Sequence, residues 1–144
     1  MSTDVAALLA RTTLVVRSGR YALGAWRHAE SPAVHAGMAR ADGELGFVLF
    51  DDIELTALVP EDTLDELPTP QKIERDFAAL TLDTVMAWDI VGVLAHVTSI
   101  LASAEIPLGA ATAYSRDHIL VPGAQLERAL EVLGPHFESV RGPA

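Results

Sequence analysis

The sequence predicts an α+β fold in which strands and helices alternate, arranged as two units that share or abut antiparallel sheets. Three observations support this prediction. Half of the 144 residues are hydrophobic, which is enough to fill a core. Residues 91–104 carry apolar side chains at helical spacing. Runs of apolar and β-branched residues, bounded by Gly, Pro and Asp, occur on both sides of this segment.

The second half of the chain has the clearest pattern. The helix expected over Val91 to Ala104 is followed by Pro107, and its apolar stripe consists of Leu94, Val97, Leu101 and Ala104. A second helix is predicted in "AQLERALEVLG", with Gly134 at the expected C′ position. Strands are predicted in "FAALTL", "LGAATAYS", "HILVPG" and "PHFESVRGPA". The resulting order, β-α-β-β-α-β, is the ferredoxin-like arrangement, with both helices on one face of a sheet.

The first half is rich in strands and predicts a modified unit of the same kind. Ser2, Thr3 and Asp4 are N-cap residue types that precede a short apolar helix. Ser18-Gly19 lies between two strand-like runs and predicts a tight hairpin. Residues 28–44 are expected to form a loop with at most one helical turn. Two further strands, "LGFVLF" and "ELTALVP", are separated by Asp51-Asp52.

A boundary between the units is predicted in "TLDELPTPQKIERD", where Pro68 and Pro70 occur among charged residues. We therefore expect an N-terminal unit over residues 1–66 and a C-terminal unit over residues 67–144. The two halves share no clean sequence repeat, so a duplicated architecture is inferred from the number of strands alone.

Composition disfavours several classes of function. The net charge is −10, which would repel a phosphate backbone, so we expect no nucleic-acid partner. No apolar run approaches the roughly 20 residues that span a bilayer, and the N-terminus has no signal-peptide pattern, so no membrane partner is expected. Cysteine is absent, which excludes thiolate chemistry and favours a reducing cytoplasm. The five histidines show no metal spacing, and we expect neither a metal nor a cofactor.

Several motifs in the second half resemble an ACT domain. Gly92-Val93-Leu94-Ala95 is similar to the start of the first ACT helix, and Ala104-Glu105-Ile106 to the step into the next strand. "AYSRDHILVP" resembles a Tyr-x-x-Asp-(His/Tyr)-x-x-Val-Pro signature. That signature is typical of the branch that contains cytosolic arginine sensors, and it is similar to the regulatory ACT pair of aspartate kinases. In the first half, "DDIELTALVPED" resembles a strand of the same branch.

The resemblance implies a regulatory protein that binds an amino acid or a similar small metabolite between two ACT units. The implied ligand-binding residues of the second unit are Ile90, Val91, Gly92, Val93, Ser115, Asp117 and His118. Those implied for the first unit are Thr56, Ala57 and Leu58. Asp89 departs from the family pattern, because a carboxylate there would repel an anionic ligand group; its alternative role is that of a helix N-cap.

The physical chemistry of these residues is consistent with an α-amino acid. A helix N-terminus presents unpaired N–H groups and about half a positive charge, which suits a carboxylate. Gly92 has no Cβ and permits close approach to that backbone. Asp117 could hold the ammonium group. The structural alternatives are that Gly92 serves helix packing and that Asp117 is an ordinary turn residue.

Three functional hypotheses follow. The leading one is a non-catalytic sensor, acting as a homo-oligomer or through a regulated partner protein. The second is an interaction module whose ligand site is vestigial, because exposed strand edges favour association. The third is a small enzyme that uses Ser115, Asp117 and His118, although no nucleophile motif accompanies them.

Overall fold

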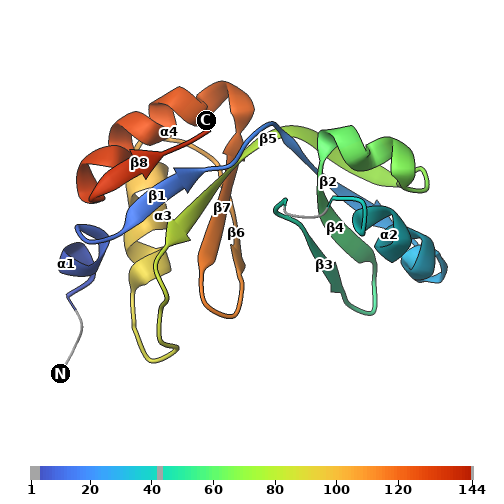
Figure 1. Ribbon diagram of the computed structural model, residues 1–144, viewed down its shortest axis with the longest axis horizontal. Coiled ribbons are helices and arrows are strands. Elements are labelled where there is room, and N and C mark those ends of the chain that lie inside the picture. Colours follow the sequence, from blue (N-terminus) through green and yellow to red (C-terminus); the bar gives the residue numbers. More distant parts are fainter. Residues whose placement is uncertain (1–3, 42–43, 144) are drawn as a thin grey trace. The chain divides into compact units, whose positions relative to one another are not determined.

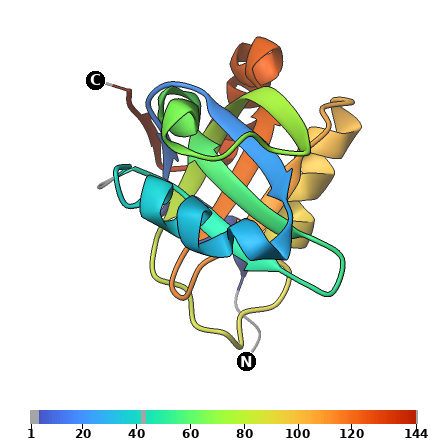
Figure 2. The ribbon, with the colours of Figure 1, turned by 90° about the vertical axis from the view of Figure 1, so that its right-hand side faces the viewer.

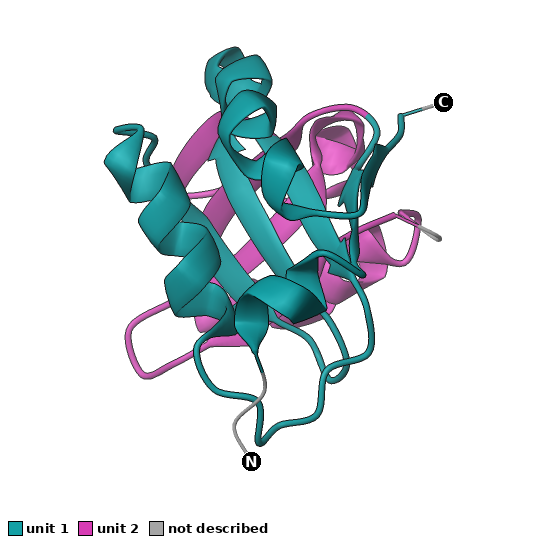
Figure 3. Cartoon of the chain, turned by 90° about the vertical axis from the view of Figure 1, so that its left-hand side faces the viewer, with its two compact units in different colours: residues 1–18, 78–144 teal, residues 19–77 magenta. Residues whose placement is uncertain are grey.

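The computed structural model describes residues 4–41 and 44–143, and these form two compact units. Unit 1 consists of residues 1–18 and 78–144, and unit 2 of residues 19–77 (Figure 3). This grouping differs from the two consecutive segments, 1–66 and 67–144, that the sequence predicts. The physical reason is the long strand β5 (Lys72–Asp83), which contributes its first part to unit 2 and its second part to unit 1.

The hairpin predicted at Ser18-Gly19 is not formed. Strand β1 (Thr13–Val16) pairs antiparallel with the second part of β5, and β2 (Tyr21–Trp26) pairs antiparallel with the first part. Among the described strands, β1 and β2 do not pair with each other. Pairing with β5 buries a longer apolar surface than a hairpin would, because residues 78–82 of β5 are all almost fully buried.

Unit 1 confirms the β-α-β-β-α-β order predicted for the second half. Its elements are α1 (Val5–Leu9), β1, the second part of β5, α3 (Val93–Ser103), β6 (Gly109–Thr112), β7 (Asp117–Pro122), α4 (Leu126–Leu133) and β8 (Ser139–Arg141). The strand order is β6-β7-β5-β1-β8. The N-terminal strand β1 therefore lies between β5 and β8, antiparallel to the former and parallel to the latter.

Helices α3 and α4 both lie on one face of the unit 1 sheet (Figures 1 and 3). The core between the helices and this face includes Leu80 and Leu82 of β5, Ile119 of β7, and Val97 and Leu101 of α3. Successive residues of a strand point to opposite faces, so Thr81 and His118, which are neighbours of these core residues, point to the other face. That face is mixed in chemistry, because the buried Ala79 and Leu120 lie on it together with polar side chains.

Three local predictions in unit 1 are corrected or refined. Helix α1 has Asp4 as its N-cap, as predicted, with the Ala7 amide donating to Asp4 Oδ1 over 3.3 Å; Ser2 and Thr3 lie outside the described residues. Helix α3 begins at Val93, two residues later than expected, and its N-cap is Gly92, not Asp89. Gly134 has right-handed helical torsions and leads from α4 into a short 3-10 helix, so the predicted left-handed C′ cap is absent there.

Unit 2 has a related topology. Its elements are β2, α2 (Ser31–Met38), β3 (Phe47–Phe50), β4 (Leu55–Pro60), the 3-10 helix η2 (Glu61–Glu66) and the first part of β5. The strand order is β3-β4-β2-β5. This is the ferredoxin-like order, with η2 in the position of the second helix.

Helix α2 corrects the prediction of a loop over residues 28–44. It lies across one face of the unit 2 strands (Figure 2), and Val34 packs there against a core that includes the fully buried Trp26. Pro32 stands in its first turn, where the missing N–H costs nothing. Gly37 permits close contact with η2, because a Cβ there would lie 2.5 Å from the Glu66 carbonyl oxygen. Pro and Gly are typical of loops, which is why the sequence of residues 28–44 predicts a loop.

Candidate functional site

An open pocket with a volume of about 300 Å³ lies in unit 1 where two segments meet. One segment is the connection between β5 and α3 with the first turn of that helix, and the other is the β6–β7 hairpin. Its lining residues are Met86, Ala87, Trp88, Ile90, Gly92, Val93, Leu94, Ala95, Thr112, Ala113, Tyr114, Ser115, Arg116 and Asp117. The Met86 amide donates to the Ser115 carbonyl oxygen over 3.1 Å and joins the two segments.

The first turn of α3 forms one wall of the pocket. Gly92 adopts φ of +95°, a left-handed conformation that favours glycine. The first hydrogen bond within the helix is from the His96 amide to the Gly92 carbonyl, and no side chain caps this end. The amides of Val93, Leu94 and Ala95 therefore have no partner within the helix, and these residues line the pocket.

The β6–β7 hairpin supplies the charged wall. Asp117 as a whole residue is 9% exposed, and its side chain makes no hydrogen bond or ion pair with another described residue. Its carboxylate oxygens are not among the buried atoms that lack a partner, so they are accessible from the open pocket. Arg116 precedes it in the turn and donates from Nε to Asp83 Oδ1 over 2.7 Å and from Nη1 to Ser115 Oγ over 3.2 Å. An unpaired carboxylate, a guanidinium and free helix amides therefore line the same pocket, which provides complementary positions for ligand groups of both signs.

The structure brings together five of the residues expected at the site: Ile90, Gly92, Val93, Ser115 and Asp117 all line the pocket. Val91 is 84% exposed and does not line it. In unit 2, Thr56 lines a separate hollow beside Lys72 and Glu74, whereas Ala57 and Leu58 are buried.

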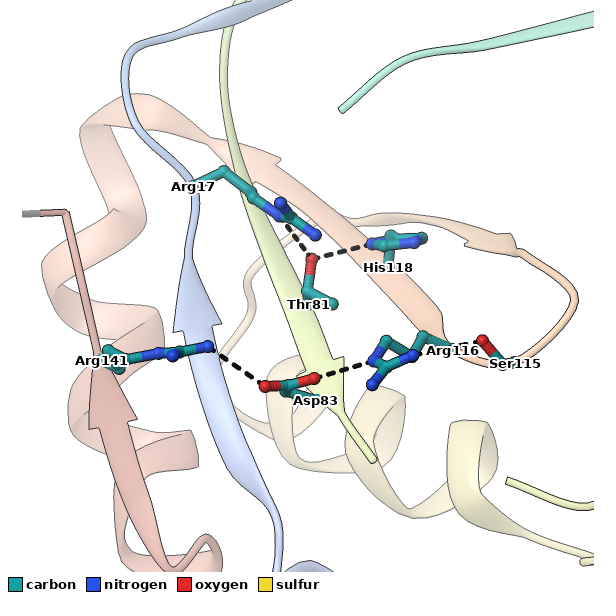
Figure 4. Close-up of polar contacts among 7 residues, drawn as sticks. All are labelled: Arg17, Thr81, Asp83, Ser115, Arg116, His118 and Arg141. Carbon is teal, nitrogen blue, oxygen red and sulfur yellow. Dashed lines mark hydrogen bonds and ion pairs between the residues drawn. The ribbon is translucent and has the colours of Figure 1, made fainter. Parts of the chain in front are cut away.

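His118 points away from the pocket, because it follows Asp117 on β7 and adjacent strand residues face opposite sides. Its Nδ1 is 2.8 Å from Thr81 Oγ1, which accepts a hydrogen bond from Arg17 Nε, also over 2.8 Å (Figure 4). Burial lowers the pKa of His118, and the charges of Arg17 and Arg116 lower it further, while Asp117 acts in the opposite direction. Ser115, Asp117 and His118 do not form a hydrogen-bonded series of the kind that activates a nucleophile.

Arg116 and the connection over residues 84–92 were missed as parts of the site by sequence reasoning. The signal for Arg116 was its position beside Asp117 in a hairpin turn. The connection carried an unusual number of apolar residues for a loop, of which Trp88 is 74% exposed beside the pocket.

Residues 4–41 and 44–143 contain neither a membrane-spanning helix nor a metal site. No helix in these ranges has the length and apolar character needed to cross a bilayer. No group of three His, Cys, Asp or Glu side chains in them is arranged to hold a metal ion.

Residues 72–134 match the family model of the ACT domain. This ACT segment runs from β5 through α4 and contains every residue that lines the pocket. Strands β1 and β8 and most of unit 2 lie outside it. No curated protein sequence matches the chain significantly.

Solved structures resemble nearly the whole chain. The protein Atu0741 from Agobacterium tumefaciens has a TM-score of 0.74 at 21% identity, covering 93% of this chain and 95% of that one. The regulatory subunit of aspartate kinase from Thermus thermophilus has a TM-score of 0.62 at 14% identity, covering 87% and 97%. VC0802 from Vibrio cholerae, described as a possible transport protein of unknown function, has a TM-score of 0.69 at 22% identity, covering 92% and 94%. These likenesses show the fold alone, which is an ACT-like, ferredoxin-type fold that matches the regulatory subunit of aspartate kinase in structure.

Proposed function

We propose that this protein is a non-catalytic regulatory protein that binds a free α-amino acid in the unit 1 pocket. The observation that carries the proposal is Asp117, whose carboxylate has no hydrogen-bond or ion-pair partner and lines the pocket together with the first-turn amides of α3. A cationic ligand group is the natural complement of this unpaired charge. The helix amides and Arg116 suit the ligand carboxylate.

The match of residues 72–134 to the ACT domain supports a regulatory role. Ligand binding would favour the conformers in which the connection over residues 84–92 and the β6–β7 hairpin enclose the ligand. Regulation then follows from the population shift, transmitted through self-association or through a partner protein. The assignment to the branch that contains arginine sensors stays a prediction.

The test is a thermal-shift screen of the twenty amino acids against the full chain. A ligand present at 100 times its Kd stabilises the folded state by about 2.7 kcal/mol. Asp117→Asn keeps the shape of the side chain and removes its charge, so it should abolish the shift. Asp52→Asn is a matched control, because Asp52 is an exposed residue in the corresponding turn of unit 2. A flat profile for the well-folded wild type at millimolar ligand would contradict the proposal.

A contribution of unit 2 to the same ligand is a separate part of the proposal. Thr56 was expected to supply a hydroxyl, with Ala57 and Leu58 beside it. Thr56→Val removes the hydroxyl with little change of volume. A reduced thermal shift in this variant, with an unchanged melting temperature in the absence of ligand, would support a site shared by both units; an unchanged shift would restrict the site to unit 1.

The second candidate function is a protein-interaction module, and the edge strand β3 of unit 2 favours it. This strand ends the unit 2 sheet order, and Leu49 and Phe50 on it are exposed large hydrophobic residues. Exposed apolar edge strands pair readily with other chains. Sedimentation with and without amino acids separates the candidates: association that is independent of every amino acid favours the module.

A further inference from the structure

The face of the unit 1 sheet that α3 and α4 do not cover carries a cluster of three arginines, Arg17, Arg116 and Arg141, which we call the arginine cluster. Arg17 follows β1, Arg116 lies in the β6–β7 turn, and Arg141 ends β8. All three are directed towards Thr81 and Asp83 of β5, which share this face (Figure 4). The cluster lies outside the helix-covered core of the unit.

Asp83 is the carboxylate at the centre of the cluster. It accepts from Arg116 Nε over 2.7 Å and from Arg141 Nη2 over 3.1 Å. The hydrogen bond from Arg116 is the main cause of the lowered pKa of Asp83, and the charges of Arg141 and Arg17 lower it further. All three guanidinium groups therefore act on one carboxylate. One negative charge neutralises one of the three positive charges, so an excess of two remains on this face.

This excess is unusual for the chain. Its net charge is −10, and it has only 10 Lys and Arg residues in all. Bringing three of them to one carboxylate costs free energy through mutual repulsion unless an anion compensates it. The Arg141 side chain is 66% exposed and that of Arg116 is 38% exposed, so solvent and solutes reach the cluster.

His118 adds a neutral donor to the same face. Arg17 Nε donates to Thr81 Oγ1, which leaves the hydroxyl proton of Thr81 to be donated to Nδ1 of His118. This arrangement places the proton of the neutral imidazole on Nε2. Burial is the main cause of the lowered pKa of His118, the charges of Arg17 and Arg116 lower it further, and Asp117 acts in the opposite direction. The neutral form of the ring, with its proton on Nε2, is therefore favoured beside the arginine cluster.

We propose that the arginine cluster and His118 Nε2 bind a small phosphate-bearing anion, at a site distinct from the amino-acid pocket. Guanidinium groups match phosphate oxygens with paired N–H donors, and a dianion would neutralise the excess of two positive charges. Arg116 lies at the border of both sites, since it also lines the pocket. Arg17 and Arg141 do not line the pocket, so they test the anion site by itself.

The experiment is a titration of the full-length protein with inorganic phosphate at constant ionic strength, followed by NMR of the histidine side chains. The expected result is saturable binding and an increase in the pKa of His118, because a bound anion favours the imidazolium form. Arg17→Gln and Arg141→Gln should each weaken phosphate binding about tenfold, the loss typical of one charge-assisted hydrogen bond. Arg128→Gln is the matched control: Arg128 is an exposed arginine on α4 with its own ion pair to Glu131.

Three outcomes would overturn the proposal. The first is phosphate binding that Arg17→Gln, Arg141→Gln and the control Arg128→Gln all weaken to the same extent. The second is binding of succinate as tight as that of phosphate, which would assign the face to carboxylates. The third is phosphate binding that Asp117→Asn abolishes while Arg17→Gln and Arg141→Gln leave it intact, which would place the anion in the amino-acid pocket. Failure of the amino-acid screen leaves this titration unaffected.

Discussion

The two units close their hairpins with the same turn, but the residues at matching positions of the two turns differ in charge and polarity. In unit 1 the Ala113 amide donates to the Arg116 carbonyl over 2.9 Å, and Thr112 pairs with Asp117. In unit 2 the Asp51 amide donates to the Glu54 carbonyl over 3.1 Å, and Phe50 pairs with Leu55. Leu55 therefore occupies the position of Asp117, and Glu54 that of Arg116.

The connections beside the two hairpins also differ. In unit 1, nine residues separate β5 from α3, and they leave the pocket open. In unit 2, four residues separate β2 from α2, and His28 of this short connection hydrogen-bonds to the Asp51 carbonyl of the turn. In each unit, the topology brings the connection that precedes the first helix close to the hairpin that follows it. The two units differ in the length of this connection and in the residue at the matching hairpin position, Asp117 in unit 1 and Leu55 in unit 2.

The largest expected effect comes from giving unit 2 the acidic residue of unit 1. Leu55 is 1% exposed and packs in the unit 2 core. Leu55→Asp removes an apolar side chain and buries an unpaired carboxylate, so we expect a loss of about 3 kcal/mol or more in the free energy of unfolding. Urea denaturation measures this loss, with Leu55→Met as the volume-matched control. A loss below about 1 kcal/mol would show that the space between the connection and the hairpin in unit 2 is open enough for water to solvate the new carboxylate.

The reciprocal substitution, Asp117→Leu, should change the stability of the ligand-free protein little and remove its stabilisation by ligand. An apolar side chain replaces a carboxylate that has no partner and faces an open pocket, so the stability of the ligand-free protein should stay within about 1 kcal/mol. The stabilisation by saturating amino acid, about 2.7 kcal/mol at 100 times Kd, should disappear. Thermal shifts with and without ligand measure both quantities. Retention of the full shift would contradict the role of Asp117.

A matched pair of glycines separates backbone strain from ligand contact. Gly92 in unit 1 and Gly19 in unit 2 have φ of +95° and +72°, and a Cβ at either position meets no atom closer than 3.8 Å. Each Gly→Ala substitution should cost about 1–2 kcal/mol of stability, because both positions require a left-handed conformation. Amino-acid binding should weaken only in Gly92→Ala. Equal binding by both variants would exclude close contact of the ligand with Gly92.

The smallest effect is the pH dependence of unit 1. The pKa of His118 is lowered from 6.5 in the folded state, so the unfolded chain binds its proton more readily. Stability from this group is therefore present above pH 6.5 and decreases as the pH falls from there through the lower folded-state pKa. His118→Gln should reduce this decrease, whereas His35→Gln in unit 2 should not. Denaturation midpoints between pH 5 and 7.5 provide the measurement.

Local patterns were sufficient for part of this structure and insufficient for the rest. The apolar stripe of α3 and the β-α-β-β-α-β order were predictable, because side-chain periodicity and turn residues are properties of short segments. The place of Gly92 at the start of α3 was expected from the resemblance of Gly92-Val93-Leu94-Ala95 to the first ACT helix. Helix α2 was missed because its Pro32 and Gly37 resemble loop signals, and only contact with η2 explains Gly37.

By itself, the sequence determined the α+β class, the order of elements in the second half and five residues that line the pocket. Only the tertiary structure decided that β1 leaves its neighbour β2 and enters the unit 1 sheet, because strand pairing depends on surface buried between distant segments. It also decided that Asp117 and His118, adjacent in sequence, face opposite sides of β7. Asp117 therefore lines the pocket, whereas His118 lies beside the arginine cluster.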